Sequence, residues 1–223
     1  MEEERVRGLA RVSRRPPPAH RPPPSPPPPF PSFDPANLGA DPKALRWYAH
    51  AEVIHGRWAM LGAAGVVGTS ALHAAGTGVP EWYDAGKVSA ENTGIPLSSL
   101  LVVQMILMHF VEIKRLEDFK KPGSQSESGS FFGFESSFKG TGDPSYPGGA
   151  FDPLGLASGP PAVVDAMKTR EIKNGRLAMV ACLGFAGQHG AQPDGPIANL
   201  ARHLANPPQN CFATNGVSLP ALF

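Results

Sequence analysis

Apolar residues gather in three long segments of the chain, separated by polar stretches that are rich in proline and glycine. This pattern predicts three helices, over residues 45–75, 96–119 and 162–189. A proline suits the start of the second helix, and prolines also follow the ends of the second and third. Each segment reaches the roughly 20 residues that a helix needs to cross a bilayer, once its polar flanking turns are included.

A shorter helix is predicted over residues 197–204, and its apolar side chains share one side: Ile197, Leu200, Ala201 and Leu204. It is too short to cross a bilayer, so it should lie on the membrane surface. Residues 120–159, rich in Gly, Ser, Pro and Phe, should form a loop that packs its phenylalanines against the membrane face. The predicted fold class is an all-α membrane protein with three transmembrane helices and a short amphipathic surface helix.

Residues 1–32 contain two proline runs and should form an extended, solvated tract without helix or sheet. We interpret them as a disordered extension, and residues 33–223 as the helical membrane domain. The acidic Met-Glu-Glu-Glu start is atypical of an organelle transit peptide, which is poor in acidic residues.

With 20 basic and 19 acidic residues the chain is almost neutral, which argues against a nucleic-acid-binding protein. Its two cysteines do not make a disulfide framework. Basic residues cluster before the first helix and at both ends of the 120–159 loop, whereas the opposite side carries only Lys87 and Arg202. The positive-inside rule therefore places the N-terminus and the long loop on the same side of the membrane.

One sequence unit occurs twice, once for each outer helix. Phe33-Asp34-Pro35 precedes Glu52-x-x-His55-Gly-Arg57, and Phe151-Asp152-Pro153 precedes Glu171-x-x-Asn174-Gly-Arg176. The offset between the copies is 118 residues for the first part and 119 for the second. The repeat predicts that the first and third helices cross as a pseudo-twofold pair, with the second helix beside them. Small residues that allow close crossing recur in both copies: Ala59, Gly62, Gly65 and Gly68, and Ala178, Ala181, Gly184 and Gly187.

Charged residues at the ends of these apolar helices are costly and need partners. A Glu and the Arg five positions later are about 140° apart around a helix, so they do not pair within one helix. The twofold repeat predicts the alternative, in which Glu52 pairs with Arg176 and Glu171 with Arg57 across the crossing.

His55 and Asn174 each follow a Glu by three residues and face the same side of their helix. Nitrogen and oxygen donors of this kind suit the single axial ligand of a chlorophyll magnesium. A Glu ligand would bring a negative charge, which its paired Arg cancels. One Glu–Arg pair can then bind the metal and lock two helices.

The second helix carries a further set, in which Glu112 and Arg115 can pair within the helix. Gln104 lies in an apolar run and needs a partner such as a pigment or its bound water. Gln188 and His203 complete the candidate ligands. We interpret four other histidines of the helical domain as interfacial or packing residues: His50, His73, His109 and His189.

These motifs resemble the light-harvesting chlorophyll a/b-binding family over residues 33–210. The runs at residues 103–115, 121–124 and 146–149 look like the photosystem I peripheral antenna rather than that of photosystem II. The run at residues 122–133 resembles a minor, fifth-type member of that antenna.

The resemblance implies that seven residues bind chlorophyll magnesium: Glu52, His55, Glu112, Glu171, Asn174, Gln188 and His203. It implies that Arg57, Arg115 and Arg176 neutralise the Glu ligands, and that Gln104 holds a chlorophyll through water. His55, where some relatives with far-red absorption carry Asn, argues against that special pigment pair.

Further cofactors implied by the resemblance are chlorophylls a and b, carotenoids of the lutein, violaxanthin or β-carotene type, and a bound phospholipid. Two carotenoids would lie in grooves beside the crossed helices. The implied partners are the photosystem I core, neighbouring antenna proteins and thylakoid lipids, with the N-terminus on the stromal side.

Three other functions are alternatives to light harvesting. A di-iron carboxylate enzyme would use Glu-x-x-His on two helices, but the second copy here ends in Asn174 and each Glu has an Arg five positions later. A photoprotective relative that dissipates energy would favour a more acidic opposite face than Glu81, Asp84, Glu91 and Asp194 provide. A pigment-free structural adaptor is the third. No nucleophile or substrate pocket is needed for light harvesting, so no enzymatic activity is predicted.

Overall fold

The computed structural model describes residues 34–138 and 142–214, and the regular secondary structure of these ranges is helical. The chain divides into two compact units, Met1–Ala40 and Asp41–Phe223. The extension expected over residues 1–32 lies outside the described residues.

The described part of the first unit is a capped turn. The 3-10 helix η1 spans Leu38–Ala40, and the Asp34 carboxylate accepts the backbone N–H groups of Leu38 at 2.9 Å and Gly39 at 2.8 Å. These bonds satisfy amides at the start of the turn that have no partner within it. They also lower the pKa of Asp34, with the bond from Gly39 as the largest cause.

The second unit contains the same cap in the other copy of the repeat. The Asp152 carboxylate accepts the N–H groups of Leu156 at 2.9 Å and Ala157 at 2.8 Å, at the start of η5 (Leu156–Ser158). The repeated Phe-Asp-Pro motif therefore leads into an Asp-capped turn in both copies.

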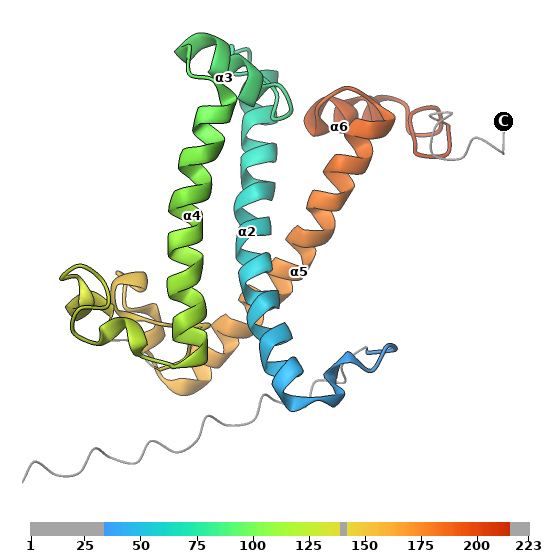
Figure 1. Ribbon diagram of the computed structural model, residues 1–223. Coiled ribbons are helices and arrows are strands. Elements are labelled where there is room, and N and C mark those ends of the chain that lie inside the picture. The colour runs from blue at the N-terminus through green and yellow to red at the C-terminus, as the bar shows by residue number, and fades with distance from the viewer. Residues whose placement is uncertain (1–33, 139–141, 215–223) are drawn as a thin grey trace, which may run out of the picture. The chain divides into compact units, whose positions relative to one another are not determined.

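The α-helices in the described part of the second unit are α2 (Pro42–Ala74), α3 (Ala85–Thr93), α4 (Leu97–Lys120), α5 (Pro161–Ala191) and α6 (Pro196–Ala205) (Figure 1). Prolines stand in the first turn of α2, α5 and α6, where a missing N–H leaves no hydrogen bond unmade. The four helices predicted from the sequence are confirmed to within three residues at each end.

Helix α3 was not predicted. Its sequence is polar and lacks an apolar period, and no side chain caps its start. It ends at Gly94, whose φ of 67° lies in the left-handed region that favours glycine.

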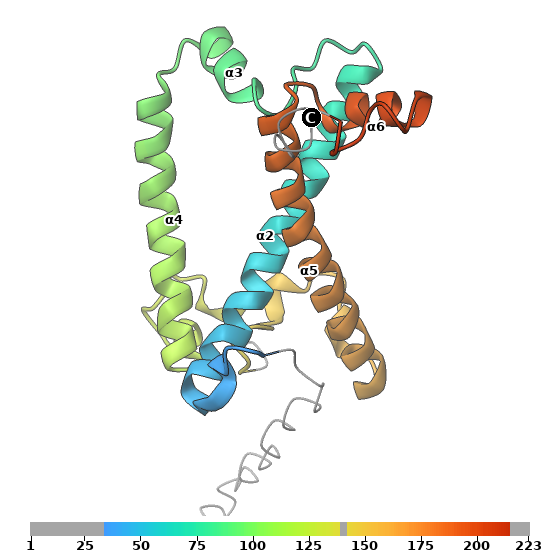
Figure 2. The same ribbon diagram turned by 90° about the vertical axis from the view of Figure 1, so that its right-hand side faces the viewer.

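Helices α2 and α5 cross, and their contact is the main packing of the second unit (Figures 1 and 2). The closest approach is between two glycines: a Cβ at Gly56 would lie 3.1 Å from Gly175 Cα, and one at Gly175 would lie 3.0 Å from Gly56 Cα. Carbon atoms in ordinary contact are about 3.5–4.0 Å apart, so neither position has room for a side chain. This reciprocal contact agrees with the predicted twofold pair.

The rows of small residues meet only near this crossing. A Cβ at Gly62 would meet the Cys182 sulfur at 3.7 Å, and the Cys182 thiol donates to the Ala59 carbonyl at 3.5 Å. Farther along, Gly65 and Gly184 have no atom within 4 Å of a built Cβ. The two helices therefore diverge and leave open space beside them.

Helix α4 stands apart from this pair (Figure 2). It packs against the 3-10 helix η2 (Ser124–Ser126) and meets α2 through side chains near its C-terminal end. There the rings of Trp47 and Phe119 lie 5.1 Å apart, edge to face, and Arg46 donates to the Phe119 carbonyl at 3.5 Å.

Apolar side chains of the long helices lie outside rather than in a core. Among the described residues only Val53 and Ala178 are buried hydrophobics, whereas Ile106 is 65% exposed and Leu183 is 75% exposed. By length and composition, α4 is the one described helix that qualifies as able to cross a membrane. The three membrane spans predicted from the sequence are therefore not confirmed as a set.

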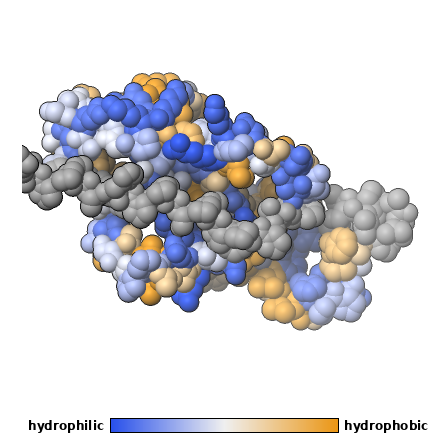
Figure 3. All heavy atoms as spheres, turned by 90° about the horizontal axis from the view of Figure 1, so that it is seen from below, coloured by the Kyte–Doolittle hydropathy of each residue, from blue (hydrophilic) through white to orange (hydrophobic). Residues whose placement is uncertain are grey.

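The ends of the long helices meet a loop-rich, hydrophilic face. Helices α2 and α5 begin there and α4 ends there (Figure 1), and seen from below this face is mostly hydrophilic, with smaller apolar patches (Figure 3). In the adjoining loop the ring of Phe131 lies 5.7 Å from that of Phe110 of α4 and 4.6 Å from that of Phe138, whereas the packing of this loop against a membrane stays a prediction. Phe132, by contrast, is 82% exposed.

Candidate functional site

Two ion pairs flank the glycine crossing, as the sequence repeat predicted. Arg57 Nε donates to Glu171 Oε1 at 2.7 Å, and Arg176 Nε donates to Glu52 Oε1 at 2.6 Å. Each pair joins α2 to α5, so the charge of each Glu is balanced by the opposite helix.

The two ion pairs differ in their exposure to solvent. The side chains of Arg57 and Glu171 are 35% and 27% exposed, whereas that of Arg176 is 63% exposed. Arg57 also donates to the Ser145 carbonyl at 2.9 Å and lies 5.1 Å from the Tyr146 ring. The long loop thus closes over one pair and leaves the other open.

Tyr146 belongs to the same cluster. Burial, followed by a hydrogen bond to Glu171, raises the pKa of its phenol above the ordinary value of 10.0. The Lys168 ammonium lies 4.2 Å from the centre of its ring. These contacts fix the loop beside Glu171.

The third predicted pair is also present, between Arg115 and Glu112 on α4. Arg115 in addition lies 3.2 Å from His50 Nε2, and His50 Nδ1 lies 2.9 Å from the Ser145 hydroxyl. Because a guanidinium can only donate, Nε2 is the acceptor and Nδ1 carries the proton. His50 was expected to be an interfacial or packing residue; it is 3% exposed, its ring lies 5.0 Å from that of Phe119, and its polar contacts in addition bridge α2, α4 and the loop.

The two predicted histidine ligands, on α2 and α6, are exposed. His55 Nδ1 lies 2.7 Å from the Ala51 carbonyl, and His203 Nδ1 lies 2.8 Å from the Asn210 carbonyl. A carbonyl only accepts, so in both neutral rings Nε2 keeps its lone pair. This is the arrangement that metal-binding histidines use, with one nitrogen held by a backbone carbonyl and the other free.

Three amide side chains complete the predicted set: Gln104, Asn174 and Gln188. All three residues are exposed on their helices, and their side chains make no hydrogen bond within the described residues. The predicted ligands therefore do not converge on one pocket but lie singly along the helices. Such a distribution suits several separate ligands rather than one metal cluster.

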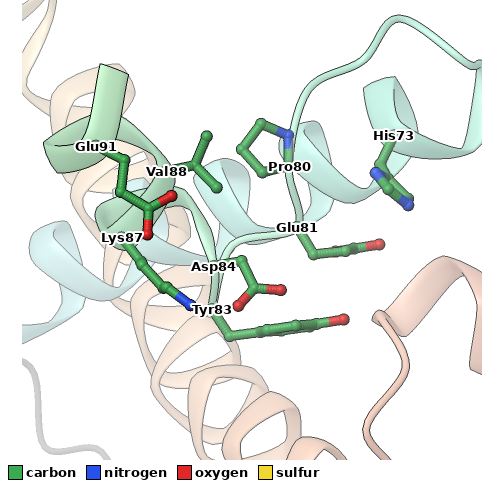
Figure 4. A pocket seen from close by; sticks show the side chains of 8 residues that line it. All are labelled: His73, Pro80, Glu81, Tyr83, Asp84, Lys87, Val88 and Glu91. Atoms are coloured by element: carbon green, nitrogen blue, oxygen red, sulfur yellow. The ribbon is translucent and has the colours of Figure 1, made fainter. Parts of the chain in front are cut away.

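A pocket of about 500 Å³ lies at the opposite end of the second unit (Figure 4). Its walls include His73 and three of the four acidic residues noted in the sequence, Glu81, Asp84 and Glu91. Glu81 is buried and accepts a hydrogen bond from the Ser70 hydroxyl at 2.5 Å. None of the predicted ligands lines this pocket.

Comparison with known proteins identifies the family. The model of the chlorophyll A-B binding protein family matches residues 17–190. The chain is 49% identical to "Photosystem I chlorophyll a/b-binding protein 5, chloroplastic" of Arabidopsis thaliana over 178 residues, which are 78% of this chain and 68% of that protein. It is 44% identical to "Chlorophyll a-b binding protein 4, chloroplastic" of the same plant, over 80% of this chain and 67% of that protein.

The matched region contains the crossing, the three ion pairs and most of the candidate ligands. The chain therefore belongs to the chlorophyll a/b-binding family, whose members are light-harvesting antenna proteins and not enzymes.

Proposed function

We propose that this chain is a peripheral antenna protein of photosystem I, which holds chlorophylls a and b and carotenoids and passes excitation to the photosystem I core. One observation carries the proposal: each carboxylate at the crossing is neutralised by an Arg of the opposite helix. A neutralised carboxylate can remain in an apolar layer and still offer an oxygen to a metal. Three relatives are named as photosystem I chlorophyll a/b-binding proteins, which supports this partner.

The membrane domain is proposed to be residues 33–223, with α2, α4 and α5 crossing the thylakoid membrane and α6 lying on its surface. Exposed apolar side chains along all three helices support this, since each would cost about 1.5–3 kcal/mol to leave in water rather than in an apolar environment. Basic residues are concentrated at the end where α2 and α5 begin. By the positive-inside rule, this end and the N-terminus face the stroma.

The residues divide into three roles in this proposal. The first is to hold chlorophyll: its magnesium would be bound by Glu52, His55, Glu112, Glu171, Asn174, Gln188 and His203, and through water by Gln104. The second is charge compensation, by Arg57, Arg115 and Arg176. The third is to leave room, because open space at Gly65, Gly68, Gly184 and Gly187 suits two elongated carotenoids and a phospholipid.

Bound chlorophyll would supply the light absorption and the excited state. The protein supplies position: rigid helices fix where each ligand atom lies, and therefore the spacing between neighbouring pigments. The crossing lock is central, because a shift there moves Glu52 and Glu171 together. No proton or bond is transferred by the chain.

Refolding the chain with a thylakoid pigment extract tests the proposal. The purified product should show chlorophyll a emission when chlorophyll b or carotenoid is excited. His55→Ala and Asn174→Ala should each lose pigment, whereas His189→Ala should keep the full set because the His189 ring stacks on Tyr83 at 4.2 Å. A folded, helical product without pigment would refute it.

A further inference from the structure

His109 lies near the middle of α4, twelve residues after Leu97 in a helix of 24. At 1.5 Å per residue this is about 18 Å from the start of a helix about 36 Å long. His109 was expected to be an interfacial or packing residue, but it is exposed and lies far from either end. Its neighbours on α4 are apolar, including Met105, Ile106 and Ile113, which are 48%, 65% and 52% exposed.

The hydrogen bonding of His109 fixes which nitrogen is available. Nδ1 lies 3.1 Å from the Met105 carbonyl, which can only accept, so Nδ1 carries the proton. In the neutral ring Nε2 then keeps its lone pair. Nε2 makes no hydrogen bond within the described residues. This is the same arrangement as at His55, where Nδ1 lies 2.7 Å from the Ala51 carbonyl.

His109 Nε2 is a hydrogen-bond acceptor that would lie near the middle of the bilayer, and there it needs a partner. Inside a bilayer there is no water to satisfy it, and an unpaired polar group in hydrocarbon is costly. The polar residues of α4 do not supply one: Glu112 is paired with Arg115, and Gln104 is five positions away, about 140° around the helix. The partner must therefore come from outside the helix and must itself be stable in an apolar layer.

The chemistry of a single imidazole in an apolar layer restricts what kind of partner can bind there. A free divalent cation would need several oxygen ligands, and a single neutral imidazole does not provide them. A metal already held in an apolar macrocycle needs only one axial nitrogen and no compensating charge. No basic side chain lies within a turn of His109, which agrees with a neutral ligand.

We propose that His109 Nε2 is an additional axial ligand for a chlorophyll magnesium on α4. This inference rests on the proposed antenna function and adds a site to it. His109 and Glu112 are three residues apart, as are Glu52 and His55, so the two residues lie about 60° apart around α4 and about 4.5 Å apart along it. The site lies on the helix that stands apart from the crossed pair, and His109 itself is exposed there.

The test is pigment stoichiometry of the full chain refolded with a thylakoid pigment extract. His109→Leu should lose one chlorophyll relative to the unmodified chain, and the difference absorption spectrum should show a single missing band. His109→Gln keeps a donor atom and should retain that pigment. His73→Leu is the matched control, because His73 has the same Nδ1 bond, to the Val79 carbonyl at 2.8 Å, but lines the polar pocket at the helix end.

The outcomes separate the two proposals. If the unmodified chain binds no pigment, the antenna proposal itself fails. If His55→Ala loses pigment while His109→Leu keeps the full number, only the His109 site is overturned. Equal loss from the Leu and Gln variants would indicate packing rather than ligation and would also overturn it. Nitrogen NMR of the unmodified chain, labelled at histidine and loaded with pigment, should show His109 Nε2 bound to metal. This measurement does not use the Leu variant, so a folding defect in that variant cannot affect it.

Discussion

Substituting Gly56 by Ala tests whether α2 and α5 cross in direct contact at Gly56 and Gly175. The new methyl would lie 3.1 Å from Gly175 Cα and 3.6 Å from its carbonyl carbon, both backbone atoms. Because the backbone cannot rotate away as a side chain can, the helices must separate by a few tenths of an ångström to restore ordinary contact. Overpacking of this kind costs about 1–3 kcal/mol.

The same separation would strain both ion pairs, which lie on either side of the crossing at 2.7 and 2.6 Å. We therefore expect Gly56→Ala to lower the melting temperature of the refolded complex by several degrees, at about 2–4 °C per kcal/mol for a chain of this size. Circular dichroism and the loss of energy transfer between pigments would report the melting.

Gly62→Ala is the matched control on the same helix. Its methyl would meet only the Cys182 sulfur at 3.7 Å, which is ordinary contact, so stability should be unchanged or slightly higher. If Gly56→Ala melted at the same temperature as Gly62→Ala, the close glycine crossing would be refuted.

Three further predictions concern the loop and its contacts. Arg57→Met should lower the free energy of unfolding by about 1 kcal/mol more than Arg176→Met does, because it also removes the hydrogen bond to the Ser145 carbonyl. Detergent denaturation curves of the two variants would measure this difference, and equal free energies of unfolding would contradict the prediction. Asp152→Ala should cost about 0.5–2 kcal/mol and speed protease cleavage near residue 152, since two amides lose their acceptor; unchanged cleavage would contradict it. Because the pKa of Tyr146 is raised in the folded state, its neutral phenol stabilises the fold at and below about pH 10, and this stability should fall as the pH rises further. Absorbance at about 295 nm should show one tyrosine that ionises at a higher pH than the others and is missing in Tyr146→Phe. Ionisation of all tyrosines at the ordinary pH would contradict this prediction.

Local signals explain why the sequence predicted the long helices well. Apolar runs, prolines in first turns and polar breaks all act within a few residues, and the bounds of α2, α4, α5 and α6 agree closely with the prediction. Helix α3 lacks such signals, because its residues are polar and its end depends on the left-handed Gly94. The capped turns at Asp34 and Asp152 were visible as a repeat, but the repeat alone did not reveal their hydrogen bonds.

The cross-helix ion pairs were predictable because helix geometry excluded pairing within one helix. The difference in their solvent exposure was not predictable, since it depends on where the loop residues Ser145 and Tyr146 fold back onto Arg57, from which they are far in sequence. The same limit applies to His50, whose bridge to Arg115 joins segments 65 positions apart. His109 could have been noticed from the sequence, because it is a histidine in the middle of an apolar run.

The central claim is that one Glu–Arg pair serves both as a helix lock and as a chlorophyll site. Two double variants separate these roles at the more open pair. Glu52→His with Arg176→Leu removes both charges but keeps a donor atom, whereas Glu52→Leu with Arg176→Leu removes the donor too. Both variants lose the lock equally, so any difference in pigment content reports ligation alone.

The most direct measurement is the number of chlorophylls per refolded chain in these two variants. The account predicts that the His/Leu variant keeps the chlorophyll at position 52 and that the Leu/Leu variant lacks one. Equal chlorophyll numbers in two equally helical products would contradict it, because position 52 would then contribute no ligand.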